Sequence, residues 1–594
     1  MGVLYGIVGS FDSAAADAMA ARLRHRSEQL VHSRLNEGVL FGTGLRADQA
    51  ELHQRDGLTL VGDIDIYNAD EIAHELSVES ELPEELLLAA WRRWGPDCLG
   101  RMNGDFALAI HDERDGSVTL ARDISGARPV FFGAWGGCIV FASEYKALVA
   151  LPDFSKTLDR QGLQRLQSRK FLEQGRTLLH EIDQVPAGSW MRIQPGLRSA
   201  PTRYWSTQVS LQSRSLADHA AEIRRQFIHA MERRIRGDDT YGIAVSGGID
   251  SLAMVAAARQ IHPDGKIRTF SVGDAQDDPE LRWASRAADL YRTEHTSLVV
   301  STERLKAVLP KMVWHLEAPI ARTETFLAYQ LAEEASKTID RLIGGYAADG
   351  VFGGMPKHRI PAIAGRLGVG RKTLSEVYSY SQTGIQPKRP LARFLVKAYF
   401  RGKTPPVPSV IGAQAAQPLE EFPNHGPELL NEILRAGTDL APQLWMAKVD
   451  RPNAAFGLSY SSPFFDPELI GAAFTVPSHY KHSIRTNKLV FREAVATLLP
   501  EELATRPKYA QRIRESAEFC DVLEDIAQDA LNPAIVQSRG IFSPAEVSKL
   551  MKRPADGRWP PEHAMRIWTL VLTELWMQIF LDGNGESPES TESS

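Results

Sequence analysis

Cysteine is scarce in this chain. Its 594 residues include only three cysteines, Cys98, Cys138 and Cys520, which are odd in number and widely spaced. This pattern excludes a disulfide framework and a zinc site built from cysteines. We therefore expect a protein of a reducing compartment, the cytoplasm.

An excess of positive charge and a long apolar run are also missing. Lysine and arginine number 68 against 74 acidic residues, so the net charge is −6 and nucleic acid is not an expected partner. No apolar run approaches the length of a transmembrane helix, so we expect no membrane span. An anionic ligand would have to be bound locally, by a dedicated site.

The patterning of apolar residues divides the chain into two main parts. Residues 1–205 contain closely spaced segments of period-two alternation with turn residues between them, which predicts packed antiparallel sheets. In residues 206–582 helical patterns alternate with short apolar runs, which predicts a parallel α/β sheet. The polar residues 583–594 lack aromatic side chains and are predicted to be disordered.

Residues 356–440 interrupt the second part as a Pro- and Gly-containing insertion. Between Lys357 and Lys403 eleven basic residues face a single acid, Glu376. They are Lys357, Arg359, Arg366, Arg371, Lys372, Lys388, Arg389, Arg393, Lys397, Arg401 and Lys403. This segment could gather an acidic peptide, a partner protein or a membrane surface, or it could be a solvated helical face. We assign it no catalytic role.

Residues 242–258, GIAVSGGIDSLAMVAAA, carry the clearest chemical signal. An apolar strand ends at Val245 and a helix begins near Asp250, with a Ser-Gly-Gly loop between them. Such a loop presents backbone N–H groups and the positive end of a helix to an anion. A carboxylate at Asp250 beside phosphates suggests a magnesium ligand. The alternative is a plain glycine turn in which Asp250 caps the helix.

The motif SGGxDS is the pyrophosphate-loop motif, and with it the chain resembles the asparagine synthetase family, which includes β-lactam synthetase and the lasso-peptide macrolactam synthetases. Three further segments are similar to that family: TFSVG (residues 269–273), GGYAADGVFGG (344–354), and SPFFDPELI together with NKLVFREA in the C-terminal part. The resemblance implies an Ntn-type antiparallel β-sandwich followed by an adenine-nucleotide α-hydrolase-like synthetase domain. It also implies ATP and Mg²⁺, with a carboxylate adenylated and a nitrogen nucleophile displacing AMP.

The resemblance assigns roles to individual residues. It implies that the ligands of ATP and pyrophosphate are Ser246, Gly247, Gly248, Asp250, Ser251, Val272 and Gly345. Asp250 and Asp349 would share the magnesium ion, and Lys488 would stabilise charge on the way to the acyl-adenylate. The alternative for Lys488 is a solvated helix lysine.

Tyr346 stands where asparagine synthetases carry an acid, which makes β-lactam synthetase the better match. In that relative the tyrosine helps to deprotonate the attacking amine together with a glutamate. Asp450 is the nearest acid to the expected partner position, displaced by a few residues. Tyr346 could also be a packing aromatic. Gly350, which replaces a family glutamate, is a second departure from asparagine synthetase.

The front part resembles a glutaminase domain without its nucleophile. Tyr5 takes the place of the N-terminal cysteine, and four residues precede it. Val61 replaces the asparagine of the oxyanion site. Nucleophile, terminal amine and oxyanion donor are thus all missing, so we expect no release of ammonia from glutamine. The nitrogen would then arrive as an amine of the substrate itself.

The resulting prediction is an ATP-dependent, AMP-forming amide ligase, most similar to a lasso-peptide macrolactam synthetase that joins a peptide N-terminus to an Asp or Glu side chain. Its expected partners are a precursor peptide, a leader-peptide protease and a leader-binding protein. Three alternatives remain: a glutamine-hydrolysing asparagine synthase, a small-molecule β-lactam synthetase acting on an amino-acid-derived substrate, and a catalytically silent homologue that binds nucleotide and peptide.

Overall fold

The computed structural model describes most of the chain. It covers residues 2–588 except for 28, 37, 45–51, 81, 170–171, 173–174, 236–239, 367, 371, 375, 378–379, 381–385, 400–426, 446–447, 484–485, 505–512, 514–515 and 556. The basic residues Arg371, Arg401 and Lys403 of the insertion lie outside the described residues. So do residues 589–594 of the C-terminal tail.

Two antiparallel sheets form the front domain. The first has the order β10-β8-β9-β1-β3-β2, and the second has the order β12-β11-β7-β6-β5-β4 with β13 paired to β11. The strands of the first sheet are β1 (Leu4–Val8), β2 (Leu30–Asn36), β3 (Val39–Gly44), β8 (Phe131–Trp135), β9 (Cys138–Ala142) and β10 (Ile182–Gln184). Those of the second are β4 (His53–Arg55), β5 (Leu58–Ile66), β6 (Gly104–Asp112), β7 (Ser117–Arg122), β11 (Ser189–Gln194), β12 (Leu197–Arg198) and β13 (Thr202–Arg203).

Side-chain alternation along β1 explains why both faces of its sheet are buried. Leu4 and Val8 point into the core between the two sheets, where they meet Phe41 and Phe141. Tyr5 and Ile7 point the other way, into the large cluster shared with the rest of the chain. Period-two alternation places successive residues on opposite faces. The predicted antiparallel sandwich is thereby confirmed.

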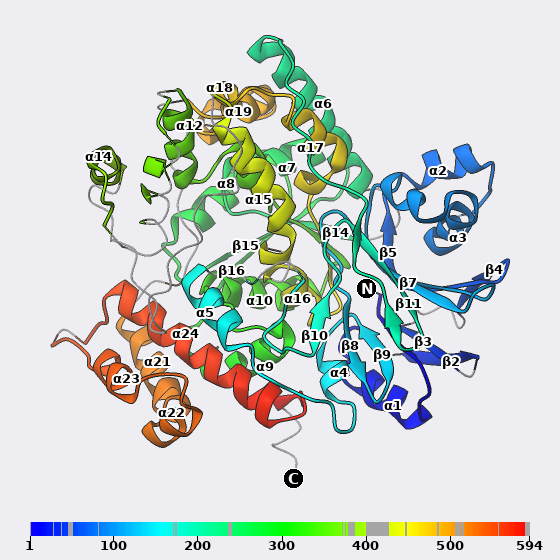
Figure 1. The fold of residues 1–594 in the computed structure, drawn as a ribbon. Helices are drawn as coiled ribbons and strands as arrows, with labels where there is room; N and C mark the ends of the chain where they lie inside the picture. The colour runs from blue at the N-terminus through cyan, green and yellow to red at the C-terminus, as the bar shows by residue number, and fades with distance from the viewer. Residues whose placement is uncertain are drawn as a thin grey trace.

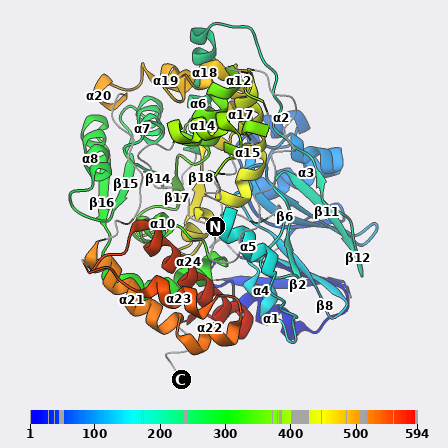
Figure 2. The ribbon, with the colours of Figure 1, turned by 60° about the vertical axis from the view of Figure 1, so that its left-hand side comes forward.

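Helices cover the outer faces of this sandwich. They are α1 (Ser13–Ala21), α2 (Ala69–Leu76), α3 (Pro83–Trp94), α4 (Lys146–Val149) and α5 (Arg160–Arg169). Buried leucines of α3 pack on Phe106 and Leu108 of the second sheet. Figures 1 and 2 show this domain, coloured blue to cyan, side by side with the green parallel sheet.

The second part is built on a five-stranded parallel sheet in the order β16-β15-β14-β17-β18. Its strands are β14 (Tyr241–Ala244), β15 (Arg268–Gly273), β16 (Glu294–Val299), β17 (Arg341–Ile343) and β18 (Ser459–Ser461). From β14 the chain moves outward to β15 and β16 and then returns to β17 on the other side. Ligands of open parallel sheets bind at the carboxyl ends of the strands where the order reverses. That place is between β14 and β17.

Helices surround the parallel sheet. They are α6 (Leu216–Arg234), α7 (Ile249–Ile261), α8 (Pro279–Tyr291), α9 (Leu305–Leu316), α10 (Glu324–Ala335), α11 (Ala348–Phe352), α16 (Asp450–Ala454), α17 (Pro467–Ala473), α18 (Ser478–Lys481), α19 (Leu489–Val495) and α20 (Glu501–Ala504). The alanine-rich α7 is buried from Ser251 to Ala258, because small side chains allow it to lie close to its neighbours. The predicted α/β sheet is confirmed.

The basic insertion forms three described helices, α12 (Arg359–Arg366), α14 (Pro390–Tyr399) and α15 (Leu429–Trp445). Figure 1 shows α14 at the edge of the molecule. The described basic side chains Arg359, Lys372, Lys388, Arg389, Arg393 and Lys397 are exposed. Arg389 pairs with Glu376, at 3.4 Å between Nε and Oε1. The insertion therefore presents a positively charged surface.

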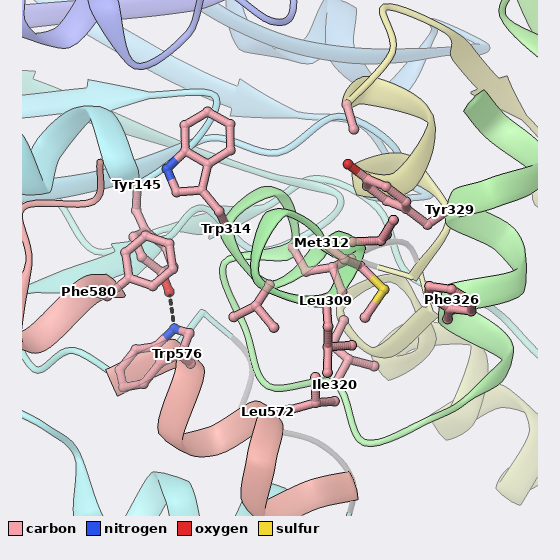
Figure 3. Packing of buried hydrophobic residues seen from close by; sticks show 14 of the residues in the cluster. Tyr145, Leu309, Met312, Trp314, Ile320, Phe326, Tyr329, Leu572, Trp576 and Phe580 are labelled. Carbon is pink, nitrogen blue, oxygen red and sulfur yellow. Dashed lines mark hydrogen bonds between the residues drawn. The ribbon is translucent and has the colours of Figure 1, made fainter. Parts of the chain in front are cut away.

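Four C-terminal helices, α21 (Ala517–Ala530), α22 (Pro533–Arg539), α23 (Pro544–Met551) and α24 (Pro561–Met577), close the molecule against the front domain. Figure 3 shows part of this contact, which brings together aromatic side chains of three separate segments: Tyr145, Trp314, and Trp576 with Phe580. The Trp576 indole N–H donates to the Tyr145 hydroxyl at 2.7 Å.

Two features of the C-terminal part bear on the sequence expectations. Residues 563–582 form one helix that is long and apolar enough to cross a membrane, although 67% of its apolar window is buried in this structure. It acts as a core helix because its apolar side chains pack on the front domain and α9. At the start of the tail predicted to be disordered, the Gly583 carbonyl accepts from Lys156 and the Gly585 carbonyl from Trp314.

Candidate active site

The Ser-Gly-Gly loop joins β14 to α7. Gly247 has φ +65°, a left-handed conformation that favours glycine. Gly248 is the residue that precedes the helix, which begins at Ile249, and no side chain caps it. Asp250 therefore does not cap the helix, unlike in the plain-turn alternative. Ser251 holds the loop, since its Oγ donates to the Gly248 carbonyl at 2.9 Å and accepts from Ser246 N at 3.2 Å.

The second loop, residues 344–354, follows β17. A side chain at Gly344 would collide with the Tyr460 hydroxyl, so glycine is required there. Ala347 has φ +74°, which is rare for a residue with a side chain and indicates a strained turn. The Tyr346 carbonyl accepts a hydrogen bond from Ser462 Oγ at 2.7 Å. Both loops therefore leave neighbouring strands at the carboxyl edge of the sheet.

Lys488 joins the two loops. Its Nζ lies 2.6 Å from Asp250 Oδ2 and 2.6 Å from Asp349 Oδ1, although 238 residues separate Lys488 from Asp250. The lysine is not a solvated helix residue, because only 3% of its side chain is exposed. Burial opposes its charge, but the two carboxylates outweigh that effect and raise the pKa of Lys488. The amine is therefore a fixed positive charge between the loops.

Asp250 and Asp349 fit a magnesium ion. They lie in the first turns of α7 and α11, which follow the adjacent strands β14 and β17, and both contact Lys488, which balances their charge. Among the residues that the structure describes, no group of three His, Cys, Asp or Glu side chains could hold a metal. Mg²⁺ is commonly bound by one or two carboxylates together with phosphates and water. Two aspartates beside a phosphate loop meet that requirement.

A cavity of about 380 Å³ opens at this edge of the sheet. The expected ligands that line it are Ser246, Gly248, Asp250, Ser251, Val272, Gly345, Tyr346 and Asp349. Gly247 is not among its lining residues. Lys488 lines a smaller neighbouring cavity of about 30 Å³, together with Gly248, Asp250 and Arg492. The structure thus gathers the predicted residues other than Gly247 along two adjoining cavities.

Tyr346 lies in the wall of the large cavity. Its ring meets that of Tyr460 edge to face, with centroids 6.2 Å apart. Burial raises the pKa of Tyr346 well above its usual value, and the negative charge of Glu324 raises it further, whereas Arg322 lowers it. The phenol therefore stays protonated at neutral pH and can donate a hydrogen bond, but it cannot act as a base by itself.

Glu324 is an acid whose negative charge raises the pKa of Tyr346, and sequence reasoning missed it. It lines the same cavity, and its Oε1 lies 3.3 Å from Arg322 Nε. It belongs to no motif, so only tertiary packing brings it to the tyrosine. Asp450, the acid considered from the sequence, is buried and pairs instead with Arg26 and Arg128, both at 3.4 Å. Asp450 is therefore not the partner of Tyr346.

In the front domain, Tyr5 occupies the position where the resemblance predicts a nucleophilic cysteine. The ring of Tyr5 is fully buried and lies so close to Gly42 that any side chain there would collide with it. Its hydroxyl lies 3.3 Å from His32 Nδ1, and burial raises its pKa. Val61 packs in the core, whereas Asp63 accepts from Gly2 N at 3.0 Å. Tyr5 therefore fills the position that a nucleophilic thiol would need.

The three cysteines do not replace it. All are free and buried. Burial raises the pKa of Cys98 to about 12 and also raises that of Cys138, so both thiols stay protonated and unreactive. The predicted loss of glutaminase chemistry is thus consistent with the geometry, and it stays a prediction until ammonia release is measured.

Comparisons with known proteins agree with this geometry. The family model for asparagine synthase matches residues 222–578, and that for the glutamine amidotransferase domain matches residues 6–205. A putative glutamine-hydrolysing asparagine synthetase of Mycobacterium tuberculosis is 27% identical over 96% of this chain and 94% of its own length. Asparagine synthetase 1 of Bacillus subtilis is 26% identical over 87% of this chain and 85% of its own.

A carboxyethyl-arginine β-lactam synthase of Streptomyces clavuligerus is 31% identical over 50% of this chain and 56% of its own length. With the phosphate loop, the paired aspartates and Lys488 on one sheet edge, the chain belongs to the asparagine synthase family and is an ATP-dependent carbon–nitrogen ligase.

Proposed function

We propose that this protein adenylates a carboxylate of its substrate with Mg·ATP and joins it to an amine of the same molecule, forming a lactam and releasing AMP and pyrophosphate. The observation that carries the first half is the buried contact of Lys488 with Asp250 and Asp349 at the strand-order reversal. The chain would use no glutamine, because Tyr5 stands where the thiol would be.

In the first half, the substrate carboxylate oxygen attacks the α-phosphorus of ATP and pyrophosphate leaves. Mg²⁺ held by Asp250 and Asp349 would neutralise the phosphates. The loop backbone, Ser246 and Ser251 bind the departing phosphates, and Lys488 balances the negative charge that develops on them. When phosphates and metal enter, the lysine exchanges part of its contact with the aspartates for phosphate oxygens.

In the second half, the amine attacks the acyl carbon and AMP leaves. The amine attacks as the neutral base, and Glu324, which lines the cavity, accepts the one proton that the nitrogen loses as the C–N bond forms and the bond to AMP breaks. The protonated Tyr346 hydroxyl orients the amine by hydrogen bonding. This assignment replaces the tyrosine base with a carboxylate base.

The finer proposal is a macrolactam synthetase of the lasso-peptide type. Attack within one molecule suits a chain without an ammonia source, because it supplies the nucleophile at a high effective concentration. The substrate would be a precursor peptide with a free N-terminal amine and an Asp or Glu side chain. A leader-peptide protease and a leader-binding protein are the proposed partners. The second candidate is a small-molecule lactam synthetase, favoured by Tyr346 and by the 31% identical relative.

The test is ATP/pyrophosphate exchange by the purified chain with Mg²⁺, screened over short peptides that carry an acidic side chain and over β-amino acids. Mass spectrometry then follows loss of one water and release of AMP. Asp250→Asn and Lys488→Met should each lower exchange at least 100-fold. Glutamine-dependent ammonia release would overturn the proposal, and so would release of ADP in place of AMP. Turnover of β-amino acids alone would favour the second candidate.

A further inference from the structure

We propose that the front domain positions the amine end of the synthetase cavity, through Arg128 and its contacts with residues 450–460. The inference rests on the proposed function and gives the domain a part in the amide-forming step. Arg128 is a positioning residue, since it lines no described cavity and acts through the wall that it holds.

Arg128 reaches across the domain interface to three neighbouring groups. Its Nη1 lies 3.4 Å from Asp450 Oδ1 and 3.5 Å from the Tyr460 carbonyl, and its Nη2 donates to Ser459 Oγ at 3.2 Å. Within its own domain, Nη2 contacts Asp65 Oδ2 at 2.9 Å. Only 1% of the side chain is exposed. One guanidinium thus ties the front domain to both α16 and β18.

A second pair of contacts holds the same helix. Asp450 Oδ2 also lies 3.4 Å from Nη2 of Arg26, and the next residue, Arg451, lies 3.0 Å from Glu144 Oε1. Arg26 and Glu144 in turn contact each other at 2.6 Å. Two adjacent residues of α16 with opposite charges are therefore each paired with the front domain. This fixes both the position and the rotation of the helix.

The held segment is a wall of the cavity. Val449, Asn453 and Tyr460 line it, and Tyr460 packs edge to face on Tyr346. The phosphate end depends on different contacts, because Asp250 and Asp349 are joined by Lys488 from the same part of the chain. Movement of residues 450–460 should therefore disturb Tyr346 and the amine, and should leave the phosphate loop in place.

Buried ion pairs suit this role. A fully desolvated charge must keep its partners, so a set of them permits few alternative arrangements. A displacement of about 1 Å at a reacting group can cost roughly 100-fold in rate. The contribution of Arg128 is thus expected in the rate of amide formation more than in stability alone.

The experiment uses the full-length chain and the variants Arg128→Lys and Arg128→Met. Hydrogen exchange is followed by mass spectrometry with Mg·ATP as the probe ligand. We expect amides of residues 449–461 to exchange about 10-fold faster in Arg128→Met, with those of residues 243–255 unchanged. The dissociation constant of Mg·ATP should stay within about 3-fold. Arg128→Lys, which keeps the charge, should restore part of the protection.

Two further measurements separate positioning from general loss of stability. The control is Arg539→Lys, which alters a partly buried Arg–Glu contact, Arg539 to Glu574 at 2.9 Å, among the C-terminal helices. In the activity assay, hydroxylamine serves as a small diffusible nucleophile. Lactam formation by Arg128→Lys should fall at least 10-fold, while ATP/pyrophosphate exchange and hydroxamate formation stay within about 3-fold.

The inference would be overturned if Arg128→Lys lost ATP/pyrophosphate exchange, hydroxamate formation and lactam formation equally. It would also be overturned if residues 449–461 were as well protected from hydrogen exchange in Arg128→Met as in the control. Wild-type protein without any exchange would instead overturn the proposed function. If Arg128→Met does not fold, Asp450→Asn removes the same charge contact with little change in shape, and the same readouts apply to it.

Discussion

At the scale of single residues, the site depends on charges whose partners are distant in sequence. Lys488 meets Asp250 across 238 residues, and Glu324 lines the same cavity as Tyr346 without any motif around it. The two pairs divide the chemistry, with a fixed positive charge at the phosphates and a negative charge at the amine. The two half-reactions should therefore respond to different substitutions.

Glu324→Gln tests this division. Without the carboxylate proton acceptance is not supported, so lactam formation should fall about 100-fold or more while ATP/pyrophosphate exchange stays within about 3-fold. Glu333→Gln is the matched control, because Glu333 pairs with Arg304 at 3.1 Å outside the cavity. Equal activity of Glu324→Gln and the control would remove Glu324 from the reaction.

Lys481 gives a pH dependence of stability. Burial lowers its pKa to about 7, so above pH 7 the native amine is neutral while the unfolded chain still binds the proton. Stability therefore rises with pH from about 7 towards 10, by at most about 1.4 kcal/mol per pH unit. Lys481→Met should lack this rise. Melting curves of the wild type and of Lys481→Met, recorded from pH 7 to pH 10, check this prediction. An equal change of melting temperature with pH in both proteins would contradict it.

At the scale of elements, the unit of strand, glycine loop and helix was readable from the sequence. The SGGIDS motif predicts a strand end followed by a turn, and the small residues of α7 predict a closely packed helix. The partner of Tyr346 could not be predicted from the sequence. The spacing of residues suggested Asp450, but it does not reveal that Asp450 pairs with Arg128 of the front domain. The sequence also did not predict that Thr438 of the insertion lines the cavity. Such relations exist only after the helices have packed.

Gly247→Ala tests the loop as an element. At φ +65° an alanine is strained by about 1 kcal/mol, which should lower the melting temperature slightly. The main effect should be weaker binding of Mg·ATP, by about 10-fold or more, because the loop must shift away from the phosphates. Gly540→Ala is the control, since it has φ +59° and an open surrounding far from the cavity. Equal nucleotide affinity in both variants would contradict the role of the loop.

At the scale of the whole molecule, the front domain is a two-sheet sandwich with Tyr5 at the position where the resemblance places a nucleophilic cysteine. Period-two alternation predicted packed antiparallel sheets in residues 1–205, and the change to helical patterns predicted a second part after them. The structure adds that ion pairs of Arg26, Arg128 and Glu144 tie it to α16. The domain is thus in direct contact with a helix that lines the synthetase cavity.

A glutamine analogue that alkylates catalytic cysteines should leave the enzyme fully active. Tyr5 cannot react, and the buried thiols of Cys98 and Cys138 stay protonated. The measurement is ATP/pyrophosphate exchange and lactam formation after prolonged incubation, with mass spectrometry of the intact chain. Covalent modification together with loss of activity would show a glutaminase nucleophile that this account does not contain.

The most direct test of the central claim is transfer of labelled oxygen from the substrate. A carboxylate that supports exchange is labelled with ¹⁸O and converted with Mg·ATP. The account predicts that one labelled oxygen appears in the phosphate of AMP, because the carboxylate oxygen attacks the α-phosphorus and stays with AMP when the amine displaces it. Label that appears in inorganic phosphate, or AMP without label, would contradict it.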